Sequence, residues 1–264
     1  MNFFRKRKNK NTVTLRCYTT DPLVYEHAKI QKAAHYFPKW WKDTPKIVGE
    51  HATIKNCIAI QEFYKKGIVI PSWFTAEITV HTKEHPEGLS YSYLQSYTEQ
   101  EFSMAHNGDQ YPHIAKQGYA NMKINSPWYI KTDDEIYFHW GDPYYNKFDN
   151  CLEGMDLLPA VTNFKFQHET NINYFLNNNY SSDICNKIEA FDPLVILHPI
   201  TEKNIEIETH LVSADEMRRL FPQDWFVIVQ PDPRIVKSVY TQKKKVLNKI
   251  EERQQQSKCP FGKL

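Results

Sequence analysis

SPWYIKTDDEIYFHW, residues 126–140, is the stretch of sequence that decides the fold class. It contains two runs rich in aromatic and β-branched residues, 128–131 and 135–140, with a polar turn between them. Runs of this kind, bounded by turn residues, are typical of short strands. Similar runs occur along most of the chain, at residues 76–83, 90–97, 120–125, 161–168, 194–198 and 205–212. They predict a mainly β (α+β) fold with an antiparallel β-sandwich or jelly-roll-like core.

Short helices are expected on either side of this β-rich region. Asn56 is a suitable cap for a short N-terminal helix that stops at Gly67, because polar side chains cap helix starts and glycine favours helix ends. Ser213 and Glu216 have the spacing of a capping box for a helix that ends at Leu220.

The remaining segments set the expected domain organisation. Asp232 followed by Pro233 predicts the start of a longer C-terminal helix. The Asn-rich stretch 171–183 predicts a surface loop. Because no clean linker divides the chain, we expect a basic flexible tail at residues 1–11, a single β-rich domain at residues 12–230, and a C-terminal helix and tail at residues 231–264.

The composition argues against the common classes of enzyme. The chain has 8 glycines and 15 prolines, and it contains no G-x-G-x-x-G, Walker-type or G-x-S-x-G motif. Common nucleotide-binding enzymes and hydrolases are therefore not expected. The five cysteines are dispersed and never in C-x-x-C spacing, which fits a reducing compartment. No apolar run approaches the length of a membrane span, so we expect a soluble protein with no membrane contact.

A run of basic residues lies close to the N-terminus and consists of Arg5, Lys6, Arg7 and Lys8. The net charge of the whole chain is only +2, so the chain as a whole is not tuned to nucleic acid. The run is a candidate contact for nucleic acid or for an acidic partner surface. The alternative is a solvated, mobile terminus, which is the commoner fate of short charge runs.

The segment His81-Thr82-Lys83-Glu84-His85 matches the H-x-x-E-H pattern of inverted zinc proteases. That chemistry requires both histidines on one helical face, with the glutamate as general base. The residues before His81 alternate like a strand, and Pro86 and Gly88 would break a helix immediately afterwards. We therefore expect the match to be accidental.

A second reading of the histidines is a cupin-like non-haem iron oxygenase of the 2-oxoglutarate type. Such an enzyme holds Fe²⁺ with two histidines and one carboxylate. His85 and Glu87 have the spacing of the first two ligands, and His168 is one of the later histidines that would supply the third. The two-histidine cupin spacing His-x-His is absent. The competing interpretation places these histidines at strand ends with ordinary hydrogen-bond partners.

The chain is rich in large aromatic residues, with 6 tryptophans and 16 tyrosines. Tryptophan is enriched at protein interfaces, so Trp40, Trp41, Trp128 and Trp140 are candidate partner-binding residues. The alternative for each one is core filling. The oligomeric state and the identity of a partner cannot be read from these residues.

Several short blocks of the sequence resemble an uncharacterised protein family that recurs in tailed marine bacteriophages of the cyanophage myovirus type. The blocks are PKWWKDTP at 38–45, TIKNC at 53–57, KGIVIP at 66–71, SPWYIKT at 126–132, EAFDPL at 189–194 and KCPF at 258–261. This chain departs from the family pattern in two places, because the pattern has a proline after Cys57 and a glycine near Asp192.

The resemblance covers most of the chain and implies a phage-encoded protein in the host cytoplasm or in the virion. It implies no activity, since none is assigned to the family and its blocks carry no known catalytic residue. Together with the failed catalytic motifs, it leads us to expect a non-catalytic binding or structural protein that contacts a protein partner.

Overall fold

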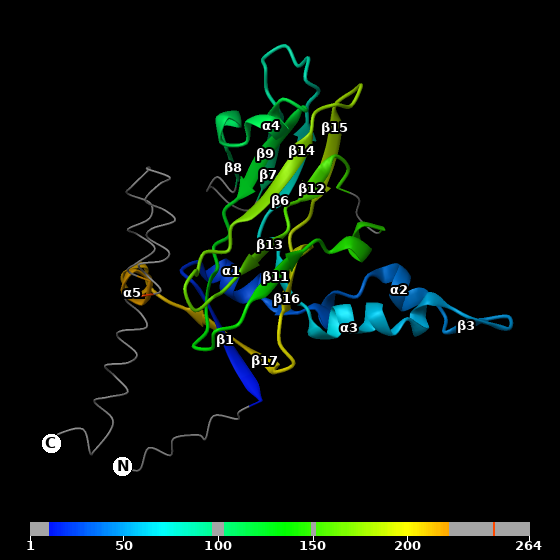
Figure 1. Cartoon of the computed structure of the whole chain (residues 1–264), viewed down its shortest axis with the longest axis vertical. Helices are drawn as coiled ribbons and strands as arrows, with labels where there is room; N and C mark the ends of the chain where they lie inside the picture. The colour runs from blue at the N-terminus through cyan, green and yellow to red at the C-terminus, as the bar shows by residue number, and fades with distance from the viewer. Residues whose placement is uncertain (1–10, 97–102, 149–151, 222–244, 246–264) are drawn as a thin grey trace.

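The computed structural model describes residues 11–96, 103–148, 152–221 and Lys245 (Figure 1). The described part of the chain is mainly β, with 39% of its residues in strands and 23% in helices, which confirms the expected β-rich α+β class. The basic tail with Arg5, Lys6, Arg7 and Lys8 lies outside the described residues, and so does the helix expected after Asp232. Those two predictions therefore stay predictions.

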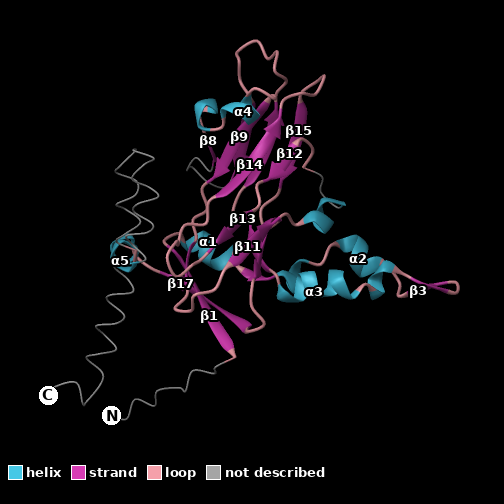
Figure 2. Cartoon of the chain, in the orientation of Figure 1, coloured by secondary structure: helices cyan, strands magenta, loops and turns pink. Residues whose placement is uncertain are grey.

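The strands of the described residues form five sheets, and Figure 2 shows these strands in magenta. The largest sheet has the order β13 (Ala160–Thr162), β11 (Phe138–Gly141), β16 (Pro193–Pro199), β5 (Ile68–Pro71) and β2 (Gln31–Lys32). A four-stranded sheet has the order β12 (Met155–Leu157), β14 (Ile172–Asn177), β9 (Tyr119–Ile124) and β8 (Ser103–Ala105). A three-stranded sheet contains β15 (Ile184–Ile188), β6 (Thr75–Val80) and β7 (Tyr91–Ser96).

Two smaller sheets complete the set. One has the order β10 (Tyr129–Lys131), β1 (Thr12–Thr19) and β17 (Asn204–Leu211), and the other is the hairpin of β3 (Ile47–Val48) and β4 (His51–Ala52). The described α-helices are α1 (Pro22–His27), α2 (Lys39–Asp43), α3 (Ile58–Lys66), α4 (Pro112–Ala115) and α5 (Ala214–Leu220). Short 3-10 turns are η1 (Ala33–Tyr36), η2 (Ile54–Asn56), η3 (Gly108–Gln110) and η4 (Tyr144–Phe148).

Strand pairing is antiparallel in all but one of the described ladders. The expected hairpin of β6 and β7 is confirmed, with Val80 opposite Tyr91 at the turn. The exception is the ladder of β1 and β17, which runs parallel from Thr12 opposite Asn204 to Thr19 opposite Leu211. Parallel pairing needs a long crossover, and almost the whole described chain supplies it here.

One continuous core lies between the sheets. It contains buried side chains from β1, β5, β6, β9, β11, β14 and β16, and Ile78, Met122 and Leu176 are fully buried in it. Trp128 is also fully buried there, and its indole Nε1 donates a hydrogen bond to the Ala28 carbonyl oxygen (3.1 Å). The aromatic stretch at residues 126–140 is therefore part of the scaffold.

The prediction of a surface loop at residues 171–183 is wrong for its first half. Residues Ile172–Asn177 form β14, which lies inside the four-stranded sheet between β12 and β9. Ile172, Tyr174 and Leu176 are buried, whereas the residues between them are partly exposed. The strand forms because this alternation places one apolar face on the core, and the abundance of asparagine concealed it.

The ends predicted for both helices are confirmed, and so is one of the two predicted starts. The amide of Gly67 closes α3 by donating to the Phe63 carbonyl, and Ser213 Oγ accepts from the Glu216 amide at the start of α5 (3.2 Å). Asn56, however, does not cap α3, which begins at Ile58. Its side-chain amide donates instead to the Lys46 carbonyl (2.7 Å).

Candidate interaction surface

A projecting arm is the most distinctive feature of the molecular outline. Residues 39–66, which contain α2, β3, β4, η2 and α3, extend sideways from the sheets (Figure 1). We refer to these residues as the arm, and to the hairpin of β3 and β4 with the neighbouring Ile54 and Ile58 as its tip. The arm matters because small elements that leave the body of a protein commonly contact another molecule.

The base of the arm is a packed aromatic cluster. Phe37 stacks on Trp41, with ring centroids 5.8 Å apart, and lies 4.3 Å from the ring of Tyr64. Trp41 and Tyr64 are buried, and they share a second small core with Val69 and Ile196 of the largest sheet. This cluster joins the arm to the sheet, so the arm is held by burial of its own apolar surface.

Hydrogen bonds to the aromatic base fix it further. The Trp40 indole Nε1 donates to the Tyr145 carbonyl (2.8 Å), and the Tyr64 hydroxyl donates to Asn146 Oδ1 (2.8 Å). His198 Nε2 lies 2.9 Å from the Phe63 carbonyl, so this nitrogen carries the proton that the carbonyl accepts. Burial lowers the pKa of His198, which favours the neutral ring at this position.

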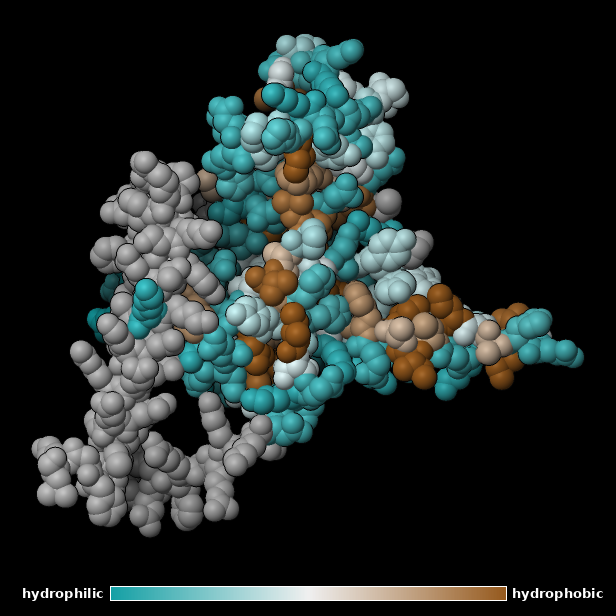
Figure 3. All heavy atoms as spheres, in the orientation of Figure 1, coloured by the Kyte–Doolittle hydropathy of each residue, from teal (hydrophilic) through white to brown (hydrophobic). Residues whose placement is uncertain are grey.

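The tip of the arm exposes an apolar surface. The exposed fractions are 65% for Ile47, 58% for Val48, 51% for Ile54 and 73% for Ile58. The space-filling view shows hydrophobic surface along this arm (Figure 3). Gly49 turns the hairpin in the left-handed region (φ 60), with no atom within 4 Å of the position a Cβ would take. A cluster of exposed isoleucine and valine on one projection is typical of an interaction site.

Lysines surround the apolar tip. Lys42, Lys46 and Lys55 lie in or beside it, and Lys55 Nζ donates to the Lys42 carbonyl (2.7 Å). The acidic residues here are Glu50 and Asp43, and Asp43 is paired with Lys39. The tip therefore suits an apolar partner surface that carries acidic residues at its edge.

Phe191 is an exposed aromatic residue in the turn just before β16. The Asp192 amide donates to the Glu189 carbonyl (3.1 Å), so Glu189–Asp192 is a tight turn. Phe191 has φ 77 and is the one non-glycine residue with positive φ in the described part of the chain. That backbone suits the third position of a type II turn, where glycine is favoured.

The Phe191 turn borders a hollow of about 590 Å³. Its apolar lining includes Leu23, Val24, Trp73 and Phe191 itself. The strained backbone is held in place because the Phe191 amide donates to the Ser72 carbonyl (2.8 Å) and the Ser72 amide donates to the Asp192 carbonyl (2.7 Å). The hollow is a second apolar feature of the surface, but unlike the arm it does not project.

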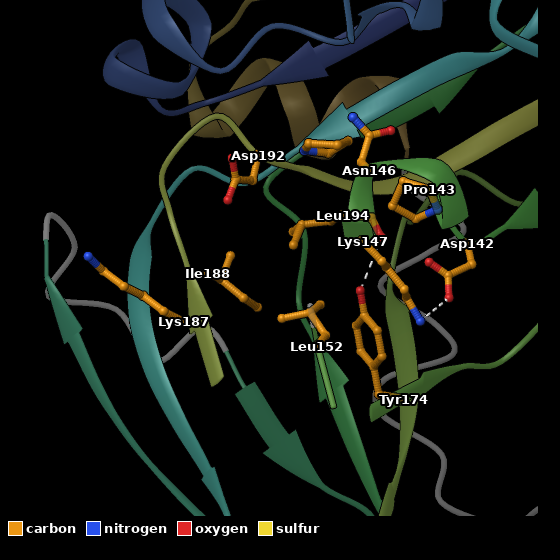
Figure 4. A pocket seen from close by; sticks show the side chains of 11 residues that line it. Asp142, Pro143, Asn146, Lys147, Leu152, Tyr174, Lys187, Ile188, Asp192 and Leu194 are labelled. Carbon is orange, nitrogen blue, oxygen red and sulfur yellow. Dashed lines mark hydrogen bonds and ion pairs between the residues drawn. The ribbon is translucent and has the colours of Figure 1, made fainter. Parts of the chain in front are cut away.

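A second hollow, of about 270 Å³, lies between β14, β15 and η4 (Figure 4). Lys147 Nζ lies 2.6 Å from the Asp142 carboxylate, and the Tyr174 hydroxyl donates to the Leu194 carbonyl (3.0 Å). Burial raises the pKa of Asp142, and the Lys147 ammonium partly opposes that rise. Lys187 is paired with Glu189 (2.7 Å). Because these groups satisfy one another, the geometry gives no support for catalysis here.

The four candidate tryptophans lie in the main core or at the base of the arm. Trp128 is fully buried, and Trp140 is buried with its Nε1 donating to Thr162 Oγ1 (2.8 Å). Trp41 is buried and Trp40 is half-buried at the base of the arm. Burial therefore corrects the expectation of a partner-binding face for Trp41, Trp128 and Trp140, whereas for Trp40 it stays a prediction. Their indole rings have more apolar area to bury than any other side chain, and the cores take them up.

The iron ligands suggested by spacing do not come together. His168 is buried, with Nδ1 3.0 Å from the Ile130 carbonyl of β10, and it belongs to the region of the β10-β1-β17 sheet. His85 and Glu87 lie in the turn between β6 and β7, in a different sheet. The set His85, Glu87 and His168 is therefore corrected, and the oxygenase reading loses its predicted Fe²⁺ site.

His81 and His85 do meet, although on a turn and not on a helix. Their ring centroids are 4.0 Å apart, and Asp183 joins them from the loop before β15. Ligand atoms of these three residues all lie within 4.8 Å of one another, the only such group of three among the residues that the structure describes. Glu84, the general base of the protease pattern, is not a member, so the expectation against a protease of this type is consistent with the geometry.

Sequence reasoning missed both the arm tip and Asp183. Ile47 and Val48 are two apolar residues among many, and no local pattern marks them as exposed. Asp183 is 102 residues from His81, so no spacing rule connects them. A weak sequence indication of the tip is Gly49 directly after the β-prone pair Ile47 and Val48, because glycine is common in hairpin turns.

Comparison with models of known protein families finds no match for this chain, and comparison with curated proteins finds none either. Within the described residues, every helix is too short or too polar to span a lipid bilayer. The case for a function therefore rests on the residues themselves.

Proposed function

We propose that this chain is a phage-encoded binding or structural protein without catalysis, and that it contacts a protein partner through the tip of the arm. The observation that carries the proposal is the exposure of Ile47, Val48, Ile54 and Ile58 on one projection. The phage origin rests on the resemblance of the blocks at 38–45 and 53–57, which lie in or next to the arm, and of the block at 66–71, which leads into β5.

Two properties of the arm support a binding role. The base of the arm is anchored to the largest sheet by Trp41, Tyr64 and the Trp40 hydrogen bond. The apolar side chains of the tip are therefore not needed to hold the arm and are available for a partner. Burying exposed apolar area on association is favourable by about 25 cal/mol per Å² before the costs of association are subtracted. Isoleucine and valine lose little side-chain entropy on binding, which suits them to such a contact.

The partner surface that fits is an apolar groove with acidic residues at its edge, because Lys42, Lys46 and Lys55 surround the tip. A contact of nucleic acid with the basic run at Arg5–Lys8 is a separate hypothesis. It predicts binding that weakens steeply with salt and disappears when residues 2–10 are deleted.

Site-specific photo-crosslinking tests the proposal. A photoreactive amino acid at position 48 is compared with one at position 161 in cells infected with the phage that encodes the chain. Val161 is a matched control because it is 55% exposed against 58% for Val48, and it lies on the edge strand β13 away from the arm. We expect one discrete adduct from position 48 and none from position 161.

The substitution Ile47→Asp in the same crosslinking protein should abolish the adduct, since a carboxylate at the tip cannot be buried without a large desolvation cost. An adduct that persists in this variant, or equal labelling from both positions, would overturn the proposal. Mass spectrometry of purified virions then gives the copy number of the chain, which separates a virion component from a protein that acts in the host cytoplasm.

A further inference from the structure

The group of His81, His85 and Asp183 is assembled from three separate places in the chain. His81 directly follows β6, His85 lies in the turn towards β7, and Asp183 directly precedes β15. β6 is paired with both β7 and β15, so these chain segments meet at one end of the three-stranded sheet. Because paired strands fix the positions of all three segments, the cluster is a product of the fold and not of one flexible loop.

His81 has a polar partner at each of its two ring nitrogens. His81 Nδ1 lies 2.7 Å from Asp183 Oδ2, and His81 Nε2 lies 2.9 Å from Ser92 Oγ. When Nε2–H donates to the serine oxygen, the lone pair of Nδ1 faces the carboxylate. In that tautomer Nδ1 and the carboxylate are two acceptors that a cation can bridge, whereas in the other tautomer Nδ1–H donates to Asp183 and the two form an ordinary hydrogen-bonded pair. Ligating histidines are commonly held by such a hydrogen bond from the other ring nitrogen.

Asp183 is oriented in the same way. Its Oδ1 accepts from the Thr82 amide (3.0 Å), which leaves Oδ2 directed at His81. The backbone beneath is fixed as well, because the buried Asn178 amide donates to the His81 carbonyl (2.6 Å) and to the Ser90 carbonyl (2.8 Å).

His85 distinguishes a metal site from an ordinary ion pair. A proton shared by His81 and Asp183 would account for their short contact, but it would give His85 no role. The His85 ring nevertheless lies against that of His81, and its contact with the Glu87 amide is long (3.4 Å). A cation gives both imidazoles and the carboxylate a common partner.

We propose that His81, His85 and Asp183 bind a divalent first-row transition-metal ion, for which Zn²⁺ is the probe. Two imidazole nitrogens and one carboxylate oxygen favour zinc and its neighbours over Mg²⁺ and Ca²⁺, which prefer all-oxygen sites. Three protein ligands leave at least one position for water. His81 is buried and the Asp183 side chain is 42% exposed, so the ion has a route of entry from one side.

The bound ion would tie the turn between β6 and β7 to the start of β15, and its role is to stabilise this end of the sheet. The inference does not depend on the arm or on the proposed function, because the two features lie on different elements.

Titration calorimetry and thermal unfolding of the chelator-treated full chain test the site. We expect one equivalent of Zn²⁺ to bind, Mg²⁺ not to bind at the same concentration, and Tm to rise by roughly 5–10 °C at a hundredfold excess of Zn²⁺ over Kd. His85→Ala and Asp183→Asn should each weaken Zn²⁺ binding at least about tenfold. Both side chains reach the surface, so the variants should fold, and circular dichroism checks this.

His51→Ala is the matched control, because His51 is exposed on β4 and is not part of the cluster. Its Zn²⁺ affinity should equal that of the wild type. The proposal is overturned if Zn²⁺ raises Tm equally in the wild type and in His85→Ala, or if no binding occurs at millimolar Zn²⁺. An ordinary ion pair predicts that Asp183→Asn lowers Tm by the same amount in chelator and in Zn²⁺, and that result also rejects the site.

Discussion

The region around Trp128 and the tip of the arm around Val48 use similar apolar residues for opposite purposes. Trp128 is enclosed by the main core and bonded to the Ala28 carbonyl, whereas Val48 is 58% exposed at the end of a short hairpin. Both segments are β in local structure. The comparison teaches that an apolar β segment becomes scaffold or interaction surface according to what the rest of the chain packs against it.

The largest expected effect breaks the scaffold side of the comparison. Trp128→Ala should lower the free energy of unfolding by about 3–5 kcal/mol, because it removes a fully buried ring and leaves a cavity. Urea denaturation measures the change. Trp128→Phe should recover part of the loss, since it restores much of the ring volume. A loss below about 1 kcal/mol for the alanine variant would show that the ring is not a core residue.

The junction between arm and sheet is expected to be next in sensitivity. A Cβ at Gly67 would lie 2.8 Å from Ile196 Cγ2 and 2.8 Å from the Phe63 carbonyl oxygen. Gly67→Ala should therefore cost about 1–3 kcal/mol of unfolding free energy through overpacking. Gly108→Ala is the matched control, because its nearest contact would be an ordinary 3.4 Å and its effect should be within about 0.5 kcal/mol. Equal effects of the two substitutions would argue against a tight junction.

The strained turn offers a stabilising substitution. Phe191→Gly should raise the free energy of unfolding by up to about 1 kcal/mol, because relief of the left-handed strain exceeds the extra chain entropy of glycine. The ring is 51% exposed, so little burial is lost. Phe191→Ala keeps the Cβ in the left-handed region and should not stabilise. If both variants destabilise equally in chemical denaturation, contacts of the ring outweigh the strain.

The base of the arm should weaken slightly in acid. The pKa of His198 is lowered in the folded protein, so the unfolded chain takes up a proton first as the pH falls through about 6.5. The neutral His198 ring therefore makes its full contribution to the free energy of unfolding above the ordinary histidine pKa. That contribution is lost as the pH falls towards the lowered pKa of the folded state. His198→Gln retains a donor for the Phe63 carbonyl and does not titrate. Denaturation between pH 7 and pH 5 should show a smaller decrease in stability for this variant than for the wild type.

The arm tip should show the smallest effect on stability. Val48→Asp is expected to change the free energy of unfolding by less than about 0.5 kcal/mol, as is Val161→Asp at a comparably exposed site. Under the proposed function, however, only the substitution at the tip removes partner contact. A clear loss of stability in Val48→Asp alone would mean that the tip packs within its own chain, and the contrast with Trp128 would then disappear.

Several features of the fold follow from local sequence. The runs around Trp128 and Trp140 form the predicted strands β10 and β11, and the linker at residues 85–88 joins the predicted hairpin of β6 and β7. The end of α3 at Gly67 and the Ser213 cap of α5 also follow from nearby residues. The residue pattern of a strand, a turn or a helix cap depends on residues within a few positions of one another in the sequence. The sequence therefore determines these features by itself.

The tertiary structure decided what these elements do. It buried Trp128, left Val48 exposed and paired β1 with β17 in parallel. It also brought Asp183 next to His81 and His85, the two histidines of an H-x-x-E-H match that lies on a turn and not on a helix. The exposure of a side chain depends on which distant segments pack against it. The contact of His81 with Asp183 likewise joins residues 102 positions apart, and local periodicity carries no information about contacts between segments so far apart in the sequence. The sequence therefore determined a β-rich scaffold, and only the packing of distant strands determined its candidate sites.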